Sequence, residues 1–199
     1  VESDAKHWMK RIFIAIDISE EGREKAAAYF DGLRRAFPML RVGWERPEKL
    51  HLTLKFLGDV NEVVLEKVRQ TTMDIAALAW PFRLSLTRTG RFPPNGDPKT
   101  LWIRVEDGGN LSEISARLND SLYRIGINAE KRRFTPHLTI GRLREPERSQ
   151  ELARRHIDSK FDPVAFDVRR ITIFHIRVPP TAAIYTRLAS LPLGQNDKP

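Results

Sequence analysis

The chain has 199 residues, of which 41% are hydrophobic and 30% charged, and 34 Lys and Arg against 26 Asp and Glu give it a net charge of +8. This composition is typical of one soluble globular domain, and the positive charge favours polyanionic partners such as nucleic acids. The absence of cysteine excludes disulfides and thiolate metal sites and fits a cytoplasmic protein, and no apolar run is long enough to span a membrane.

The first part of the chain is expected to alternate strands and helices. Residues 1–8 are polar and aperiodic, lack the apolar stretch of a secretory leader, and are expected to be a disordered tail or residues foreign to the native chain. Residues 11–18 form a short, β-branched apolar run that predicts a buried strand. Ser19 and two glutamates open a helix that carries arginines near its end and stops at Pro38. Residues 61–79 repeat apolar side chains at helical spacing and predict a second helix.

Between these two helices lies a strand that begins with His51-Leu52-Thr53-Leu54 and ends near Gly58. Because side chains alternate along a strand, His51 and Thr53 share one face and the two aliphatic residues pack into the core. Lys55 has the same parity as His51, so it is expected on the polar face as a substrate-binding residue, with a solvated lysine as the alternative. Phe56 has the parity of the aliphatic residues, so core packing is favoured over a contact with substrate.

The second part of the chain repeats this pattern. Residues 82–87 alternate like a half-buried strand, residues 92–98 are rich in turn formers, and residues 101–105 predict a further strand. Residues 110–125 place apolar side chains on one helical face. Toward the C-terminus, the pattern predicts a short polar helix and two last strands, at about residues 147–156, 164–176 and 183–191.

His137-Leu138-Thr139-Ile140 repeats the first motif within this second part. Arg142 has the opposite parity to His137, so it can reach the same face only if the strand ends or bends at Gly141. The basic run Lys131-Arg132-Arg133 precedes the motif. It predicts a solvated loop, with contact between Arg133 and RNA phosphates as the sharper alternative.

The two halves repeat the same order of elements. In both, a strand, a helix, a motif strand, a helix and a further strand follow one another, over about residues 11–87 and again over 101–174. The motif histidines lie 86 residues apart, and each follows the first strand of its half by about 36 to 40 residues. The sequence therefore predicts one bilobal α+β domain over residues 9–194, with lobes formed by the two repeats, closing strands to residue 191 and a tail at residues 195–199.

Two such motifs brought together would present two imidazoles and two hydroxyls to one ligand. Imidazole titrates near neutral pH, so one ring can accept a proton while the other donates one. The hydroxyls of Thr53 and Thr139 can bind the oxygens of a phosphate that gains charge in the transition state. The residues therefore predict general acid/base attack on a phosphodiester, with His51 and His137 as the catalytic pair.

A structural role is the more common one for a single histidine on a strand. Here two of the five histidines begin the same four-residue motif, which favours the catalytic interpretation. His7, His156 and His175 lack the motif and are interpreted as structural or solvated. No carboxylate or thiolate accompanies the motif histidines in sequence, so no metal site is predicted.

The motifs and their flanks resemble a known family. Trp44 followed by Pro47-Glu48-Lys49-Leu50-His51-Leu52-Thr53-Leu54-Lys55-Phe56-Leu57-Gly58 is similar to the first signature of the bacterial and archaeal RNA 2′,3′-cyclic phosphodiesterases. These enzymes belong to the two-histidine (2H) phosphoesterase superfamily and were historically called 2′-5′ RNA ligases. Phe134-Thr135-Pro136-His137-Leu138-Thr139-Ile140-Gly141-Arg142 resembles the second signature, and Arg11–Asp17 and Tyr185–Leu188 extend the likeness over nearly the whole chain.

The resemblance implies a bilobal α+β fold with two antiparallel sheets lining a central cleft and helices outside. It implies hydrolysis of an RNA-terminal 2′,3′-cyclic phosphate to a 2′-phosphate, with no metal, organic cofactor or obligatory protein partner, so a monomer is expected. By similarity, His51 is the acid, His137 is the base, and Arg142 contacts the substrate. Phe56 is similar to an aromatic residue that stacks on the terminal base. The sequence alone does not decide which histidine is the acid.

Other functions fit the same motifs. The site could open 2′,5′-linked dinucleotides, cleave a cyclic phosphate on ADP-ribose, or run a reversible 2′-5′ RNA ligation on tRNA halves. From a different class, the chain could be a non-catalytic RNA- or nucleotide-binding module. Two complete motifs argue against that last function, because a binding module needs no matched acid and base.

Overall fold

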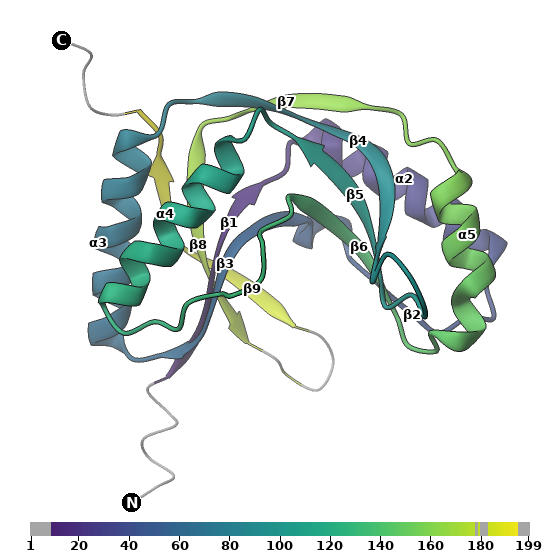
Figure 1. The fold of residues 1–199 in the computed structure, drawn as a ribbon, viewed down its shortest axis with the longest axis horizontal. Coiled ribbons are helices and arrows are strands. Elements are labelled where there is room, and N and C mark those ends of the chain that lie inside the picture. The colour runs from purple at the N-terminus through teal and green to yellow at the C-terminus, as the bar shows by residue number, and fades with distance from the viewer. Residues whose placement is uncertain (1–8, 178, 180–182, 195–199) are drawn as a thin grey trace, which may run out of the picture.

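Figure 1 shows the computed structural model, which describes residues 9–177, 179 and 183–194, as two antiparallel sheets with helices on their outer sides. The first sheet has the strand order β3-β1-β8-β9, formed by β1 (Lys10–Asp17), β3 (His51–Val60), β8 (Arg170–Arg177) and β9 (Ile184–Pro192). The second has the order β2-β6-β5-β4-β7, formed by β2 (Val42–Trp44), β4 (Phe82–Phe92), β5 (Thr100–Glu106), β6 (His137–Leu143) and β7 (Val164–Val168). The predicted α+β class with two antiparallel sheets is confirmed.

Among the described residues, four α-helices cover the outer faces of these sheets. Helices α3 (Glu62–Leu78) and α4 (Asn110–Arg124) pack on the first sheet, and α2 (Glu20–Ala36) and α5 (Gln150–Asp158) pack on the second (Figure 1). Two short 3₁₀ turns, η2 (Pro47–Lys49) and η3 (Glu147–Ser149), precede β3 and α5. In the part of the chain that the structure describes, no helix is both long and apolar enough to cross a membrane.

The helix ends follow the capping signals of the sequence. Ser19 Oγ accepts a hydrogen bond from the Gly22 amide at 3.1 Å, and Asn61 Oδ1 accepts one from the Val64 amide at 2.9 Å. Each side chain thereby satisfies one of the amides that a helix N-terminus leaves without a partner. The predicted positions of α2 and α3 are confirmed to within one or two residues.

The strands depart from the prediction in three places. β4 continues to Phe92 instead of ending at residue 87, and the short strand β2 was not predicted. The stretch predicted as one strand at residues 164–176 is divided at Arg169 into β7 and β8, which belong to different sheets. Apolar periodicity does not show that the two parts belong to different sheets, because buried residues occur on both sides of the exposed pair Arg169-Arg170, from Val164 to Val168 and from Ile171 onward.

The two lobes do not coincide with the contiguous repeats that the sequence predicts. β4 closes the first repeat but pairs with β5 and β7 in the second sheet, and β8 closes the second repeat but pairs with β1 in the first sheet. Each central strand, β1 or β5, pairs on one side with the motif strand of its own repeat and on the other with a strand of the other repeat. This exchange joins both halves into one hydrophobic core, which supports the proposal of a single domain.

Strand β1 is buried on both faces, as its continuous apolar run predicts. Ile12, Ile14 and Ile16 face the helices, and Phe13 and Ala15 face the opposite side together with Phe174. We call this opposite side, which also carries His51, the motif face of the first sheet. The corresponding surface around His137 is the motif face of the second sheet.

Candidate active site

Both motif histidines are held by the same hydrogen bond. The Nδ1–H of His51 donates to the carbonyl oxygen of Lys49 at 2.7 Å, and the Nδ1–H of His137 donates to that of Thr135 at 2.7 Å. A carbonyl oxygen can only accept, so Nδ1 carries the proton in both rings. This fixes the tautomer and leaves Nε2 of each ring to exchange a proton with a ligand.

Aromatic side chains surround both rings. His51 lies 4.6 Å from the Phe13 ring and 5.5 Å from the Tyr185 ring, measured between centroids. His137 lies 5.0 Å from the Phe92 ring and 6.1 Å from the Trp102 ring. At Gly90, next to Trp102 across the strands, a Cβ atom would overlap the indole, so glycine is needed there for the indole to keep this place.

Burial by these neighbours lowers the pKa of both histidines below the ordinary value of 6.5. The hydrogen bond to the backbone carbonyl opposes this shift in each ring, and the positive charge of Arg142 adds to it in both. One difference remains between the two rings, because only the pKa of His51 is also raised by the negative charge of Asp17. Each ring can therefore be neutral near neutral pH, with His51 closer to an anion.

The two motif strands share an irregularity at the fourth position of the motif. Along β3, Thr53 pairs with Ala15 and Lys55 with Ile14, so Leu54 is an additional residue. Along β6, Thr139 pairs with Trp102 and Gly141 with Leu101, so Ile140 is the additional residue. A β-bulge of this kind reverses the alternation of side chains beyond it.

The bulge in β3 overturns two predictions made from parity. Lys55 lies on the helix side, only 4% exposed, and its Nζ donates to Asn119 Oδ1 at 2.6 Å and to the Asn128 carbonyl at 2.8 Å. Its predicted place on the polar face, as a substrate-binding residue, is wrong. Phe56, for which core packing was favoured, pairs with Phe13 on the motif face and is 55% exposed.

The bulge in β6 has the opposite consequence for Arg142. The strand continues through Gly141, and Arg142 pairs with Thr100 on β5. Thr100 shares a face with Trp102, two positions further along β5, and this is the motif face. Its side chain is 55% exposed, and its Nε lies 3.7 Å from Glu45 Oε1. Thus Arg142 shares a face with His137 because of the bulge.

Glu45 is a neighbour of the site that sequence reasoning missed. Burial raises its pKa, and the nearby positive charges of Arg142 and Lys49 oppose this shift. The carboxyl group also raises the pKa of the Tyr185 hydroxyl, for which burial is the larger cause. Glu45 follows directly after β2, a strand too short to be recognised from its apolar pattern.

Two further charged residues on the motif faces were also missed. Asp17 pairs with His51 across β1 and β3, and Arg104 pairs with His137 across β5 and β6. Arg104 is exposed, as is Arg133 in the segment before β6. The alternation of side chains along β5 puts Arg104 on the face opposite to the buried residues Ile103 and Val105. Only the pairing of β5 with β6 places Arg104 beside His137.

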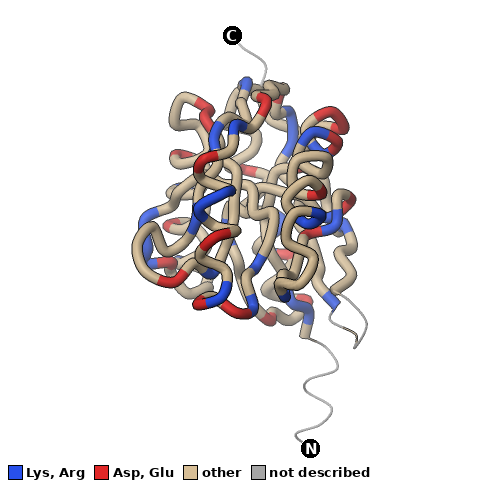
Figure 2. Tube along the Cα trace, turned by 90° about the vertical axis from the view of Figure 1, so that its right-hand side faces the viewer, with Lys and Arg blue, Asp and Glu red and all other residues tan. Residues whose placement is uncertain are grey.

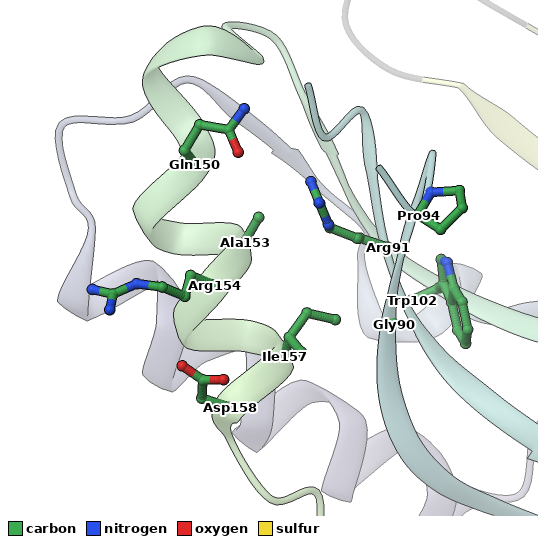
Figure 3. Close-up of a pocket in the computed structure, with 9 residues that line it drawn as sticks. All are labelled: Gly90, Arg91, Pro94, Trp102, Gln150, Ala153, Arg154, Ile157 and Asp158. Atoms are coloured by element: carbon green, nitrogen blue, oxygen red, sulfur yellow. The ribbon is translucent and has the colours of Figure 1, made fainter. Parts of the chain in front are cut away.

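A pocket of about 450 Å³ lies elsewhere, between α5 and the strands β4 and β5 (Figure 3). Gln150, Arg154 and Asp158 come from α5, while Arg91 and Pro94 lie on the opposite side of the pocket. The Arg91 guanidinium donates to the Gly96 carbonyl at 2.8 Å. None of the motif residues lines this pocket, so it lacks the paired imidazoles that the predicted chemistry needs.

The arrangement of the remaining histidines fits the structural interpretation where the chain is described. His156 is fully buried, with Nε2–H donating to the Gly90 carbonyl at 3.0 Å and Nδ1 accepting from the Tyr29 hydroxyl at 2.9 Å. His175 is partly exposed and pairs with Ile12 on the helix side of β1. His7 lies outside the described residues. Within those residues, no group of three or more His, Cys, Asp or Glu side chains could hold a metal ion.

Comparison with known proteins agrees with the geometry. Residues 23–178 match the family model of the 2′-5′ RNA ligase superfamily. The RNA 2′,3′-cyclic phosphodiesterase of Methanocaldococcus jannaschii is 31% identical over 88% of this chain and 96% of its own length. That of Methanothermobacter thermautotrophicus is 33% identical over 72% of this chain and 76% of its own length.

Solved structures share the fold. The protein TT0787 of Thermus thermophilus has a TM-score of 0.75 and 25% identity, covering 94% of this chain and 100% of its own. LigT of E. coli, solved in complex with 3′-AMP, has a TM-score of 0.73 and 24% identity, covering 94% of this chain and 99% of its own. Two sheets that each carry a His-X-Thr motif define a two-histidine phosphoesterase. Within that class, the chain belongs to the 2′-5′ RNA ligase superfamily.

Proposed function

We propose that this protein hydrolyses an RNA-terminal 2′,3′-cyclic phosphate to a 2′-phosphate by general acid/base catalysis. The observation that carries the proposal is the identical hydrogen bond of the two motif histidines, which leaves Nε2 of both rings free for proton transfer. Relatives with this activity in their names, at about 30% identity over most of the chain, support the same reaction.

The product determines which bonds change. A 2′-phosphate forms when water attacks phosphorus and the bond between phosphorus and O3′ breaks. Neutral His137 takes a proton from the attacking water at Nε2, and the imidazolium of His51 donates its Nε2 proton to O3′. The carbonyl oxygens of Lys49 and Thr135 hold the rings in orientation while the charge on each ring changes.

The phosphate oxygens gain charge in this step and need donors. Thr53 and Thr139 supply one hydroxyl each, and Arg142 supplies a guanidinium whose charge reaches both histidines. Arg142 is paired with Glu45 at 3.7 Å, so a phosphate would compete with this carboxylate for the guanidinium. Exposed Phe56 offers a face on which the terminal base can stack.

RNA beyond the terminal nucleotide needs further cations near the motifs. Figure 2 shows Lys and Arg interleaved with Asp and Glu on the side that it presents. Backbone phosphates are therefore assigned to individual arginines near the second motif, namely Arg104 and Arg133, more than to one broad basic patch. We also propose that the protein is a monomer and that it acts in the cytoplasm, the location that the absence of cysteine favours.

A substrate panel tests this function. The protein is incubated, with and without excess EDTA, with oligonucleotides ending in a 2′,3′-cyclic phosphate, with 2′,5′-linked dinucleotides and with cyclic-phosphate derivatives of ADP-ribose. The expected result is a 2′-phosphate product from the first class at a rate that EDTA leaves unchanged. Exclusive turnover of another class would overturn the substrate assignment, and activity that EDTA abolishes and a divalent ion restores would overturn the metal-free mechanism.

A further inference from the structure

Asp17 lies beside His51 at the end of the β1–β3 ladder. The two residues are direct partners in the antiparallel register, so their side chains emerge on the same face of the first sheet. The Cβ atoms of such partners lie about 4.5–5.5 Å apart. In the second sheet, the partner of His137 at the corresponding position is Arg104.

The carboxylate of Asp17 is held in place from two other strands. Thr172 Oγ1, on β8, donates to Oδ2 at 2.7 Å, and Arg187 Nη2, on β9, donates to Oδ1 at 2.9 Å. Thr172 is fully buried, and Arg187 also packs over the Phe174 ring at 5.8 Å. Both carboxylate oxygens are therefore fixed, and the negative charge has one defined position relative to His51.

The other charged and titratable groups around the two rings do not distinguish them in the same way. Arg142, from β6, acts on both histidines with the same sign. Lys49 and Tyr185 flank His51. Glu45 interacts with the charges of Arg142 and Lys49 and raises the pKa of Tyr185. Asp17 alone has a cross-strand position beside His51, whereas a cation occupies that position beside His137.

We propose that Asp17 is a positioning residue that acts through His51: its fixed carboxylate favours the charged form of this imidazole over that of His137, which makes His51 the acid and His137 the base. The inference rests on the proposed function, because an acid and a base are needed only if the site breaks a phosphodiester bond. Without Asp17, the duplicated motifs would offer two nearly equivalent imidazoles. With Asp17, the ring that is protonated first is the one that must donate to the leaving oxygen.

The test uses Asp17→Asn, which removes the charge but keeps the size of the side chain and one acceptor for Thr172. Its matched control is Asp59→Asn, since Asp59 forms an exposed ion pair with Arg11 at the other end of the same ladder, at 2.9 Å. The pH profile of kcat/KM on a cyclic-phosphate oligonucleotide and the NMR titration of the His51 ring are measured for both variants. In Asp17→Asn, the His51 titration and the alkaline limb of the profile should move to lower pH, while the acidic limb stays in place. Asp59→Asn should move neither.

Arg187→Gln supplies a change of opposite sign. Removing this cation leaves Asp17 without its ion-pair partner, so the His51 titration and the alkaline limb should move to higher pH. A shift of the acidic limb in Asp17→Asn, or an unmoved His51 titration in either variant, would overturn the proposal. The titration needs no turnover, so it decides the role of Asp17 even if the wild-type protein fails to hydrolyse cyclic phosphates. If Asp17→Asn does not fold, Arg187→Gln decides by the same two measurements.

Discussion

The first and second motifs are built on the same scaffold but have unlike surroundings. In both, the histidine Nδ1–H donates to the carbonyl oxygen two residues earlier, and a bulge follows the threonine. The residue five positions after the histidine is brought to the motif face by this bulge. It is an aromatic residue, Phe56, in the first sheet and a cation, Arg142, in the second.

This difference shows how a duplicated unit can supply two distinct roles. The repeated motif fixes ring orientation and tautomer, which both an acid and a base need. The neighbours that differ can then give the two histidines different roles. The first motif face carries an aromatic residue, Phe56, and an anion, Asp17, and the second carries two cations, Arg142 and Arg104. The predictions below either remove what the two motifs share or remove what distinguishes them.

Replacement of either motif histidine should have the largest effect. His51→Ala and His137→Ala should each reduce single-turnover hydrolysis of a cyclic-phosphate oligonucleotide by at least about 10²- to 10⁴-fold, the usual contribution of a general acid or base. Because the two groups act as a unit, the double mutant should be little worse than either single mutant. Thermal melts of the same samples test folding, and His175→Ala, on the helix side of the first sheet, is the control. Wild-type turnover in either motif variant would contradict the paired site.

Replacement of the residues that follow the two bulges, Arg142 and Phe56, should have the second largest effect on activity. Arg142→Gln should lower kcat/KM by about 10- to 100-fold, since a hydrogen bond to a charged partner contributes about 1.5–3 kcal/mol. Phe56→Ala should weaken binding of the oligonucleotide without a comparable loss in kcat, because stacking on the base does not stabilise the phosphate. Steady-state kinetics on one substrate separate these results. Equal effects on kcat in the two variants would show that the positions do not differ as proposed.

The threonines should give smaller and similar losses. Thr53→Val and Thr139→Val each remove one hydroxyl and keep the shape, so each should cost about 2- to 10-fold in kcat/KM, corresponding to a hydrogen bond of about 0.5–1.5 kcal/mol. The same assay measures both. A loss as large as that of the histidine variants would instead assign the hydroxyl a direct part in proton transfer.

Lys55 should matter for stability and hardly at all for turnover. Lys55→Met leaves the acceptors at Asn119 and Asn128 without their buried donor, so unfolding free energy should fall by about 1–3 kcal/mol. Denaturant titration measures this loss, and kcat/KM per folded molecule should stay at the wild-type value. A specific loss of activity in folded protein would restore the substrate-binding role that its position argues against.

Acidification should weaken the fold in part through His156, which is the only fully buried histidine among the described residues. Burial lowers the pKa of His156 below the ordinary value of 6.5, so the unfolded chain binds more protons there than the folded one as the pH falls below 6.5. Stability should therefore decrease with falling pH in this window, and His51 and His137 contribute with the same sign. Thermal melts across this range should show a flatter dependence in His156→Gln than in wild type. A melting temperature that rises on acidification would contradict the assignment of a buried neutral ring.

Most of the secondary structure could be predicted from the sequence because its signals are local. Ser19 and Asn61 cap the helices that they precede, and the continuous apolar run of β1 identifies it as a strand buried on both faces. The exchange of β4 and β8 between the sheets could not be predicted in the same way. Strand pairing depends on residues far apart in the chain, and either pairing would bury the same apolar side chains.

The sequence by itself determined which motif side chains share a face. His51 and Thr53, and likewise His137 and Thr139, share a face because two residues are one full period of a strand, whatever the strand pairs with. Only the tertiary structure decided the positions of Lys55, Phe56 and Arg142, since each bulge arises from register with a distant strand, β1 or β5. The same pairing placed Asp17 beside one histidine and Arg104 beside the other. Charges that lie 34 and 33 residues from their histidines in sequence become neighbours only when the strands pair.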